Sequence, residues 1–271
     1  AAPSSTINCN GVACSSGTYG AAVNVSLSAT DSGSGVAAIR YTTDGTDPTS
    51  SSPLYGSPFS VAETTTVKYR AWDVAGNVEA TKSQLVQIDV TAPTSSINCN
   101  GAACSTGWYA AGVSVSLSAV DTQSGVAAIR YTTDGSTPTT SSPLYVVPFS
   151  VAVTTTVKYR AWDVAGNVEA AKSRLIQVDT FAPTVSITSP ANGATVTGNV
   201  KIIASAADAE MGLASVSFYA DGTLIATSTS PPWQTPWNTK RSTPGQHVLT
   251  AVARDRAGNS KTSTGVTVTV R

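Results

Sequence analysis

Six aspartates are the residues of this chain whose type and spacing could do chemistry. They form two sets, Asp89, Asp121 and Asp163, and Asp179, Asp208 and Asp255. Carboxylates together with loop carbonyls are the ligands that Ca²⁺ prefers in proteins. The sequence therefore predicts a calcium ion at each of two places, if the fold brings the carboxylates of each set together. The alternative is that each aspartate only caps a turn through a local backbone hydrogen bond.

An internal repeat of about ninety residues must position these aspartates. The segment TTTVKYRAWDVAGNVEA runs from Thr64 to Ala80 and recurs letter for letter from Thr154 to Ala170, and LTAVARDRAGNS, from Leu249, is a looser copy. The first two units share roughly three positions in four, which marks them as copies of one structural unit. Because about ninety residues suffice for a small hydrophobic core, we expect three domains, at residues 1–91, 92–181 and 182–271.

The hydrophobic pattern within each unit alternates with a period of two. The segments VNVSLSA from Val23, AIRYTT from Ala38 and TVKYRAW from Thr66 all alternate in this way and are rich in valine and threonine, as β-strands are. Clusters of Gly, Pro, Asp, Asn and Ser separate them, and no segment shows an apolar stripe of helical spacing. Short strands with frequent turns predict an all-β fold of two-sheet β-sandwiches.

The topology of such a sandwich predicts where the aspartates meet. The B–C and F–G loops lie at the pole where the chain enters, next to the linker from the preceding domain. This places Asp121 and Asp163 beside the linker residue Asp89, and it places the loop residues of the second set beside Asp179. The linkers contain proline and no Gly or Ser tract, so we expect stiff hinges and a rod on the order of 10 nm long.

Four cysteines form two local pairs, Cys9 with Cys14 and Cys99 with Cys104, at corresponding positions of the first two units. A zinc site would need further thiols or histidines nearby, and the one histidine, His247, lies in the third unit. We therefore expect one disulfide in each of the first two units and an oxidising compartment. A bridge that closes so short a loop contributes only about 2 kcal/mol, so it staples a loop and does not hold the fold together.

Composition argues against several classes of protein. Lys and Arg together number 16, as do Asp and Glu, so there is no basic stripe for nucleic acid and no polybasic patch for a membrane surface. The chain contains no run of about eighteen apolar residues, so we expect no membrane insertion. His247 has no nucleophile motif near it, and no GxSxG, HExxH or P-loop pattern occurs. We therefore expect no catalytic residues and no enzyme activity.

A second group of side chains points away from the predicted core. In TVKYRAWD, alternation places Val67, Tyr69 and Ala71 on the core face and Arg70 and Trp72 on the outer face. The candidate outer cluster is Arg40, Arg70 and Trp72, with Arg130, Arg160 and Trp162 in the second unit. One interpretation is cation–π packing over the outer sheet. The other is an exposed contact platform for a sugar ring or a neighbouring chain.

The sequence also resembles known families. The first two units, with YTTDGTDPTSSSPLY followed by PFSVAETTTVKYRAWDVAGNVE, resemble the bacterial immunoglobulin-like modules named after the C-terminal domain of chitobiase and hexosaminidase. The third, with PTVSITSPANGATVTGNVKIIASAAD and HVLTAVARDRAGN, resembles another bacterial immunoglobulin-like family common in cell-surface proteins. The resemblance implies three tandem immunoglobulin-like β-sandwiches in an elongated array. Such sandwiches serve as spacers, adhesin stalks and enzyme appendages, so it implies no single function.

The function that we expect is a non-catalytic, extracellular or cell-surface spacer within a larger bacterial protein. Its partners would be other domains of that protein or further copies of itself. One alternative is the subunit of a self-assembling extracellular filament, with open sheet edges or the outer tryptophans as contacts. Another is a carbohydrate-binding or adhesion module appended to a glycan-active enzyme, in which case polysaccharide would be the partner.

Overall fold

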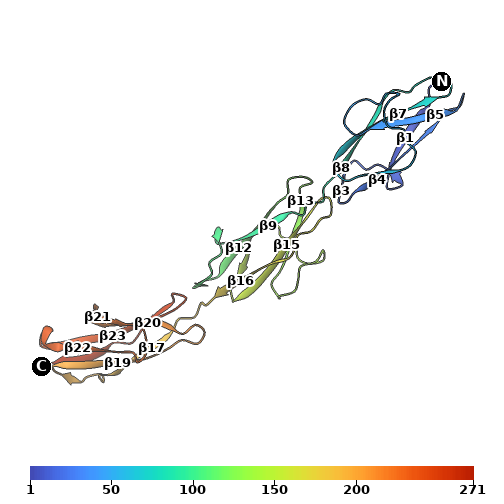
Figure 1. Cartoon of the computed structure of the whole chain (residues 1–271). Coiled ribbons are helices and arrows are strands. Elements are labelled where there is room, and N and C mark those ends of the chain that lie inside the picture. The colour runs from blue at the N-terminus through green and yellow to red at the C-terminus, as the bar shows by residue number, and fades with distance from the viewer.

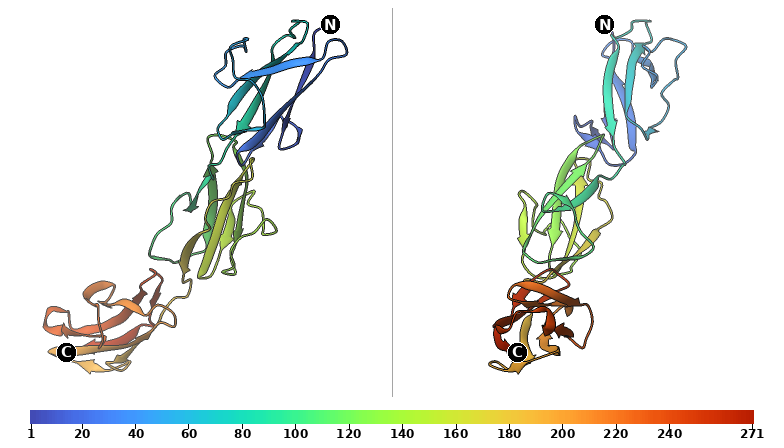
Figure 2. Two further views of the ribbon diagram at one scale, coloured as in Figure 1. Left: turned by 45° about the vertical axis from the view of Figure 1, so that its right-hand side comes forward. Right: turned by 90° about the vertical axis from the view of Figure 1, so that its left-hand side faces the viewer.

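The computed structural model describes all 271 residues and is built almost entirely of β-strands. Three groups of strands follow one another end to end, so that the two termini lie at opposite ends of a long molecule (Figure 1). The molecule is also elongated when it is turned by 45° and by 90° (Figure 2). No helix has the length and apolar character of a membrane span. The one helical element is the single turn η1 (Thr239–Arg241).

The first sandwich contains two four-stranded sheets. In order across the sheet, the first consists of β2 (Val12–Ala13), β1 (Ser4–Cys9), β4 (Val23–Thr30) and β6 (Phe59–Val61). The second consists of β3 (Thr18–Tyr19), β8 (Lys82–Ile88), β7 (Thr65–Asp73) and β5 (Val36–Thr42). The pairs within both sheets are antiparallel except that of β3 with β8, which is parallel and sets Thr18 opposite Gln87.

The second sandwich repeats this arrangement strand for strand. Its first sheet consists of β10 (Ala102–Ala103), β9 (Thr94–Cys99), β12 (Val113–Val120) and β14 (Phe149–Val151). Its second sheet consists of β11 (Trp108–Tyr109), β16 (Lys172–Val178), β15 (Thr155–Asp163) and β13 (Val126–Thr132). The parallel pair is now β11 with β16.

The third sandwich has the same two-layer plan with a different division of strands. Its smaller sheet consists of β17 (Thr184–Ser189), β19 (Asn199–Ala207) and β22 (Gln234–Asn238). Its larger sheet consists of β18 (Thr195–Val196), β25 (Val266–Val270), β23 (Gly245–Asp255), β20 (Leu213–Ala220) and β21 (Thr223–Ser228), with β24 (Ser260–Thr262) also paired to β23. The prediction of an all-β fold of tandem sandwiches is confirmed.

Each sandwich closes its own hydrophobic core between its two sheets. In β7 the residues Val67, Tyr69 and Ala71 are buried, as the alternation predicts, and in β23 Leu249 and its partners on the same face are buried likewise. The three buried clusters share no residue. Neighbouring sandwiches therefore meet only at their poles.

The predicted disulfides form in the first two sandwiches, between Cys9 and Cys14 and between Cys99 and Cys104. In each the Cα atoms lie 4.7 Å apart, a normal separation for a disulfide. Between the two bridged cysteines of the first sandwich, Asn10 and Gly11 make the turn from β1 to β2 with positive φ values of 53° and 83°. Asparagine and glycine tolerate this conformation best, so turn and bridge together fix the short edge strand β2.

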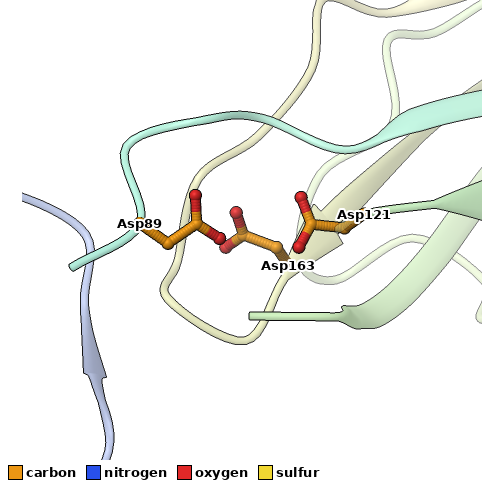
Figure 3. A group of neighbouring side chains, drawn as sticks. All are labelled: Asp89, Asp121 and Asp163. Atoms are coloured by element: carbon orange, nitrogen blue, oxygen red, sulfur yellow. The ribbon is translucent and has the colours of Figure 1, made fainter. Parts of the chain in front are cut away.

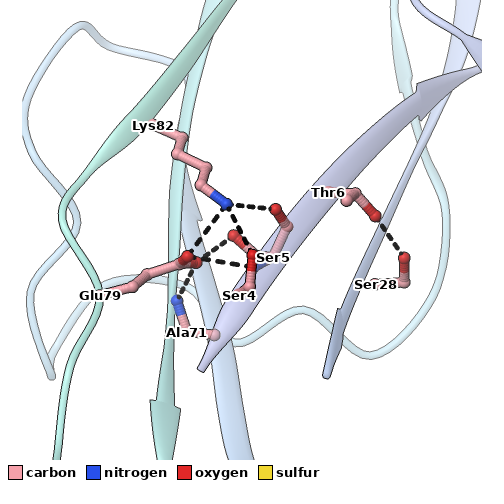
Figure 4. A network of polar contacts seen from close by, with 7 residues as sticks. All are labelled: Ser4, Ser5, Thr6, Ser28, Ala71, Glu79 and Lys82. Atoms are coloured by element: carbon pink, nitrogen blue, oxygen red, sulfur yellow. Dashed lines mark hydrogen bonds and ion pairs between the residues drawn. The ribbon is translucent and has the colours of Figure 1, made fainter. Parts of the chain in front are cut away.

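A buried glutamate ties the two sheets of the first sandwich together (Figure 4). Glu79 accepts hydrogen bonds from the backbone nitrogen of Ser5, in β1, at 3.0 Å and from that of Ala71, in β7, at 2.9 Å. It also accepts from the Ser5 hydroxyl and pairs with the Lys82 ammonium at 3.1 Å. Glu169 makes the same contacts in the second sandwich. In the third sandwich the hydroxyl of Ser263 accepts from the Ala251 nitrogen instead, at 3.0 Å.

These contacts set the charge state of Glu79. Burial raises the pKa of its carboxyl, but hydrogen bonds from Ser5, Lys82 and Ala71 outweigh burial and hold the pKa below its ordinary value of 4.5. A carboxyl whose pKa is lowered by folding adds stability above its unfolded-state pKa, and that stability is lost as the pH falls through the lower, folded-state pKa. The first two sandwiches should therefore lose stability below about pH 4.5.

Replacing both glutamates tests this role. We expect Glu79→Gln with Glu169→Gln to lower the unfolding free energy of each affected sandwich by about 1–3 kcal/mol at pH 7, because a charge-assisted network is lost. The difference from the wild-type chain should shrink as the pH falls below about 4.5. Urea unfolding followed from pH 3 to pH 7 checks this. Glu63→Gln, at an exposed glutamate, is the control, and a difference between the wild-type and double-variant chains that stays constant with pH would contradict the assignment.

Candidate functional site

The first set of aspartates meets at the junction between the first two sandwiches. Asp89 follows β8, Asp121 follows β12 and Asp163 ends β15. One carboxylate oxygen of each lies within 4.8 Å of those of the other two. Figure 3 shows the three side chains converging, with Asp89 reaching in from the segment that joins the sandwiches. Asp89 and Asp163 are buried and Asp121 is half-buried.

The second set meets at the next junction in the same way. Asp179 follows β16, Asp208 follows β19 and Asp255 ends β23, and their carboxylate oxygens again lie within 4.8 Å of one another. Asp179 and Asp255 are buried, and Asp208 is half-buried. The structure thus brings together the same six residues that sandwich topology groups from the sequence. The binding of calcium by them stays a prediction.

Loop amides orient one oxygen of the aspartates that follow β12 in the second sandwich and β19 in the third. Asp121 Oδ1 accepts from the backbone nitrogens of Gln123, Ser124 and Gly125 at 3.1, 2.9 and 2.7 Å. Asp208 Oδ1 accepts from three nitrogens at the matching positions, at 2.8 to 3.2 Å. The turn-capping role is therefore present, but it uses one oxygen of each carboxylate and leaves Oδ2 without a protein donor.

The asparagine of the repeated AGN turn holds the linker. The Nδ2 group of Asn167 donates to the main-chain oxygen of Asp89 at 2.8 Å and to Asp163 Oδ2 at 2.7 Å. Asn259 donates likewise to the main-chain oxygen of Asp179 at 2.8 Å and to Asp255 Oδ2 at 2.9 Å. The AGN turn of the repeated segment therefore also binds the linker that enters the sandwich.

Asp89 is attached to both sandwiches at once. Its backbone nitrogen donates to the carbonyl of Tyr19 in the first sandwich at 2.9 Å. Its Oδ2 accepts from the backbone nitrogen and hydroxyl of Ser124 in the second sandwich, at 3.0 and 2.5 Å. Burial raises the pKa of the Asp89 carboxyl, but the hydrogen bonds from Ser124 and Thr91 outweigh burial and leave the pKa below its ordinary value.

A close backbone approach adds to the first junction. Gly20, in the loop after β3, faces the AGN turn of the second sandwich, and a Cβ atom placed on it would lie 2.5 Å from the carbonyl oxygen of Ala165. Only glycine fits this contact without a shift of backbone. The matching position before the second junction is Ala110, so the two junctions cannot be identical in geometry.

None of the six junction carboxylates has a basic partner within 4.0 Å. The ion pairs of the chain lie elsewhere, at Lys68–Asp47, Lys82–Glu79, Lys172–Glu169 and His247–Asp221. Each junction therefore gathers three acidic side chains that only hydrogen-bond donors compensate. No histidine or cysteine belongs to either cluster, so the donor set consists of oxygen atoms, which suits hard cations rather than zinc.

The outer arginine and tryptophan residues pack on one another. The guanidinium carbon of Arg70 lies 5.0 Å from the ring centroid of Trp72, and that of Arg160 lies 4.7 Å from the centroid of Trp162. Both tryptophans are half-buried. Arg40 and Arg130, which lie opposite Arg70 and Arg160 on the neighbouring strands, donate to the carbonyls of Ser52 and Ser142. This geometry favours packing over an open platform.

His247 is engaged at both ring nitrogens. Nδ1 lies 2.5 Å from Asp221 Oδ2, and Nε2 lies 2.7 Å from the carbonyl oxygen of Thr243. Because both partners are acceptors, the geometry suits the doubly protonated ring, and these hydrogen bonds raise the pKa of His247 above its ordinary value of 6.5. His247, which is 8% exposed, thereby holds a loop of the third sandwich.

Comparison with protein families shows what kind of modules these are. The family described as Chitobiase/beta-hexosaminidase C-terminal domain matches residues 14–83 and 104–173, just over half of the chain, and the family described as Bacterial Ig domain matches residues 183–251. The chain belongs to the first family through its first two sandwiches, and its third sandwich is similar to a bacterial immunoglobulin-like domain. The expected resemblance is confirmed. Modules of these two kinds are typically non-catalytic. No curated protein matches the chain.

Several solved structures are similar to parts or all of the chain. The fibronectin(III)-like modules of CbhA from Clostridium thermocellum are 27% identical over 32% of this chain and 94% of theirs, with a TM-score of 0.30. The endo-beta-1,4-mannanase from Thermotoga petrophila is 14% identical over 34% of this chain and 20% of its own, with a TM-score of 0.29. Three N-terminal domains of the bacteriophage RB49 Hoc protein are 10% identical over 100% of this chain and 98% of theirs, with a TM-score of 0.45.

Asn167→Ala tests the hydrogen bond that holds the linker at Asp89, with Asn77→Ala as a matched control. Asn77 makes the same turn contacts to Asp73 in the first sandwich but holds no linker residue. We expect Asn167→Ala to broaden the distribution of distances between spin labels on the first and second sandwiches, because the bond to the Asp89 carbonyl is lost. We expect Asn77→Ala to leave that distribution unchanged. Equal broadening by the two variants would show that the turn and not the linker bond is responsible.

Trp72→Ala with Trp162→Ala separates packing from binding. We expect a loss of about 1–2 kcal/mol of stability in each affected sandwich, because burial and the cation–π contact are lost. Retention of the chain on insoluble polysaccharides should not change. Trp72→Phe with Trp162→Phe keeps an aromatic ring and should restore part of the stability. Lost retention with unchanged thermal unfolding would instead identify a contact platform.

Proposed function

We propose that this chain is a non-catalytic spacer in a secreted or surface-exposed bacterial protein. The observation that carries the proposal is the anchoring of each linker by both sandwiches that it joins. A spacer must keep the groups at its two ends a fixed distance apart. It does so only if successive modules cannot fold back on one another. The end-to-end arrangement in Figures 1 and 2 suits this role.

The contacts of the first linker support stiffness. Its residues are held from the first sandwich by the bond from the Asp89 nitrogen to Tyr19, and from the second by the donors Ser124 and Asn167. Gln123 Nε2 adds a contact to the Thr91 hydroxyl at 3.3 Å. A bend at this junction would have to break several of these hydrogen bonds together.

The second linker is held by fewer direct contacts. The Asp179 nitrogen donates to the Tyr109 carbonyl of the second sandwich at 3.0 Å. From the third sandwich, only the Asn259 amide donates to the linker, at the main-chain oxygen of Asp179. We therefore expect the stiffness of this junction to depend more than that of the first on any additional contact made there.

The family assignment and the disulfides support the location. Both disulfides need an oxidising compartment to persist, and bacterial modules of these kinds occur in cell-surface proteins and beside glycoside hydrolases. We propose that the partners are other modules of the same protein, held apart by this chain. The single histidine is occupied by structural bonds, which supports a role without catalysis.

Small-angle X-ray scattering of the 271-residue chain tests the spacer. We expect a monomer with a maximum dimension on the order of 10 nm, the length of three sandwiches in line, and this dimension should be constant on dilution. A variant with residues 89–93 and 179–183 replaced by Gly-Ser sequence is the control, and it should have a broader, more compact distribution. A compact wild-type particle would refute the spacer, and ordered filaments in electron micrographs would assign the chain to a self-assembling fibre.

A further inference from the structure

One substitution distinguishes the two acidic clusters. In the first, Ser124 donates its backbone nitrogen and its hydroxyl to Asp89 Oδ2. At the corresponding position of the second cluster stands Met211, in DAEMG against DTQSG. Its backbone nitrogen donates to Asp208 Oδ1 at 2.8 Å, and its side chain has no proton to donate. The linker aspartate of the second junction therefore lacks the donor that satisfies its counterpart.

The consequence is a buried carboxylate oxygen without a partner. Asp179 is 1% exposed. Its Oδ1 accepts from the Phe181 nitrogen at 2.9 Å, whereas its Oδ2 has no hydrogen-bond partner although no solvent reaches it. A buried carboxylate oxygen that is left unsatisfied is costly. A hydrogen-bond donor or a cation beside this oxygen would remove that cost.

The surroundings favour a cation. The three carboxylates of this cluster lie close together without a basic residue in reach, so their negative charges repel one another. Asp208 Oδ2 also lacks a protein donor, while the amides of its own loop fix Oδ1. Asp255 is oriented by the Gly258 and Asn259 nitrogens at 2.6 and 2.9 Å. The carboxylates are thus held in position before any ion binds.

We propose that the second junction binds a calcium ion through Asp179, Asp208 and Asp255. Ca²⁺ takes oxygen ligands at about 2.3–2.6 Å, so two oxygens on one ion lie no more than about 5 Å apart. The 4.8 Å limit within this cluster meets that requirement. Ca²⁺ also accepts irregular sets of six to eight oxygens, whereas Mg²⁺ demands a near-ideal octahedron. The ion offsets most of the negative charge of the cluster and supplies the partner that Asp179 Oδ2 lacks.

This inference rests on the proposed spacer function. It implies that different interactions stabilise the two junctions. Hydrogen bonds from Ser124 and Asn167 close the first junction. The ion closes the second, because it joins a linker residue that is bonded to the second sandwich with two residues of the third. Calcium therefore stiffens the second junction more than the first.

Calorimetric titration of the chelator-treated full chain with CaCl₂ is the test. We expect calcium to bind with a Kd of about 10⁻⁴ to 10⁻³ M, as in extracellular calcium-binding modules, or more tightly. Asp208→Asn and Asp255→Asn should each weaken binding at this site at least about tenfold. MgCl₂ should compete poorly. Asp134→Asn, at an exposed turn of the second sandwich, removes the same charge elsewhere and should change nothing.

Matched variants at the first junction decide the assignment. An ion that remains bound in Asp163→Asn but is lost in Asp255→Asn supports the proposal, whether one ion or two bind to the wild-type chain. Binding lost in Asp163→Asn and kept in Asp255→Asn overturns it, as does the absence of any binding at 10 mM CaCl₂. If scattering shows a long rod and no calcium binds, the inference fails and the spacer stands.

Exchange of the distinguishing residue gives a second measurement. Met211→Ser introduces a hydroxyl that can donate to Asp179 Oδ2 as Ser124 does to Asp89, so we expect it to weaken calcium binding about three- to tenfold. Met211→Ala removes the same side chain without adding a donor and should leave the affinity close to that of the wild-type chain. Equal affinities for these two variants would overturn the role given to the unpartnered oxygen.

Discussion

The arrangement of this molecule depends on the way a β-sandwich closes its core. Both sheets turn their apolar faces inward, as Val25 in β4 and Val67 in β7 do in the first sandwich, and the three buried cores share no residue. Contact between sandwiches is therefore confined to a few loop residues at each pole, and polar groups dominate it. Where so few residues meet, a single side chain such as Asn167 can decide how firmly two domains are joined.

The same constraint explains why one loop sequence serves two purposes. The AGN turn ends a core strand, so its position is fixed by the burial of Ala71, Ala161 or Ala253 a few residues earlier. Its asparagine amide is then available at the pole. In Asn167 and Asn259 the amide reaches the incoming chain, and in Asn77 it serves the turn alone. The repeated segment therefore contributes to the core of its own sandwich and, in the second and third sandwiches, to the attachment of the preceding one.

Much of this could be predicted from the sequence. Period-two alternation identified the core faces, and the order of strands in a sandwich placed Asp121 and Asp163 beside Asp89, because topology determines which loops share a pole. The roles of Ser124, Gly20 and Asn167 could not be predicted, since they depend on distances between domains. One signal was available for the asparagine: it persists as Asn259 in the third unit, where most of the surrounding sequence has changed. Alternation puts the arginine and tryptophan side chains on the outer face, but their mutual packing could not be predicted without coordinates.

The parallel pairing of β3 with β8, repeated in β11 with β16 and β18 with β25, has a mechanical consequence. Each pair joins a strand near the beginning of a sandwich to its last strand, and the chain enters and leaves at opposite poles. A force that pulls the two ends apart acts along these strands and across their hydrogen bonds. The bonds must then yield together rather than in succession, so each sandwich resists tension at the place where force enters the next linker.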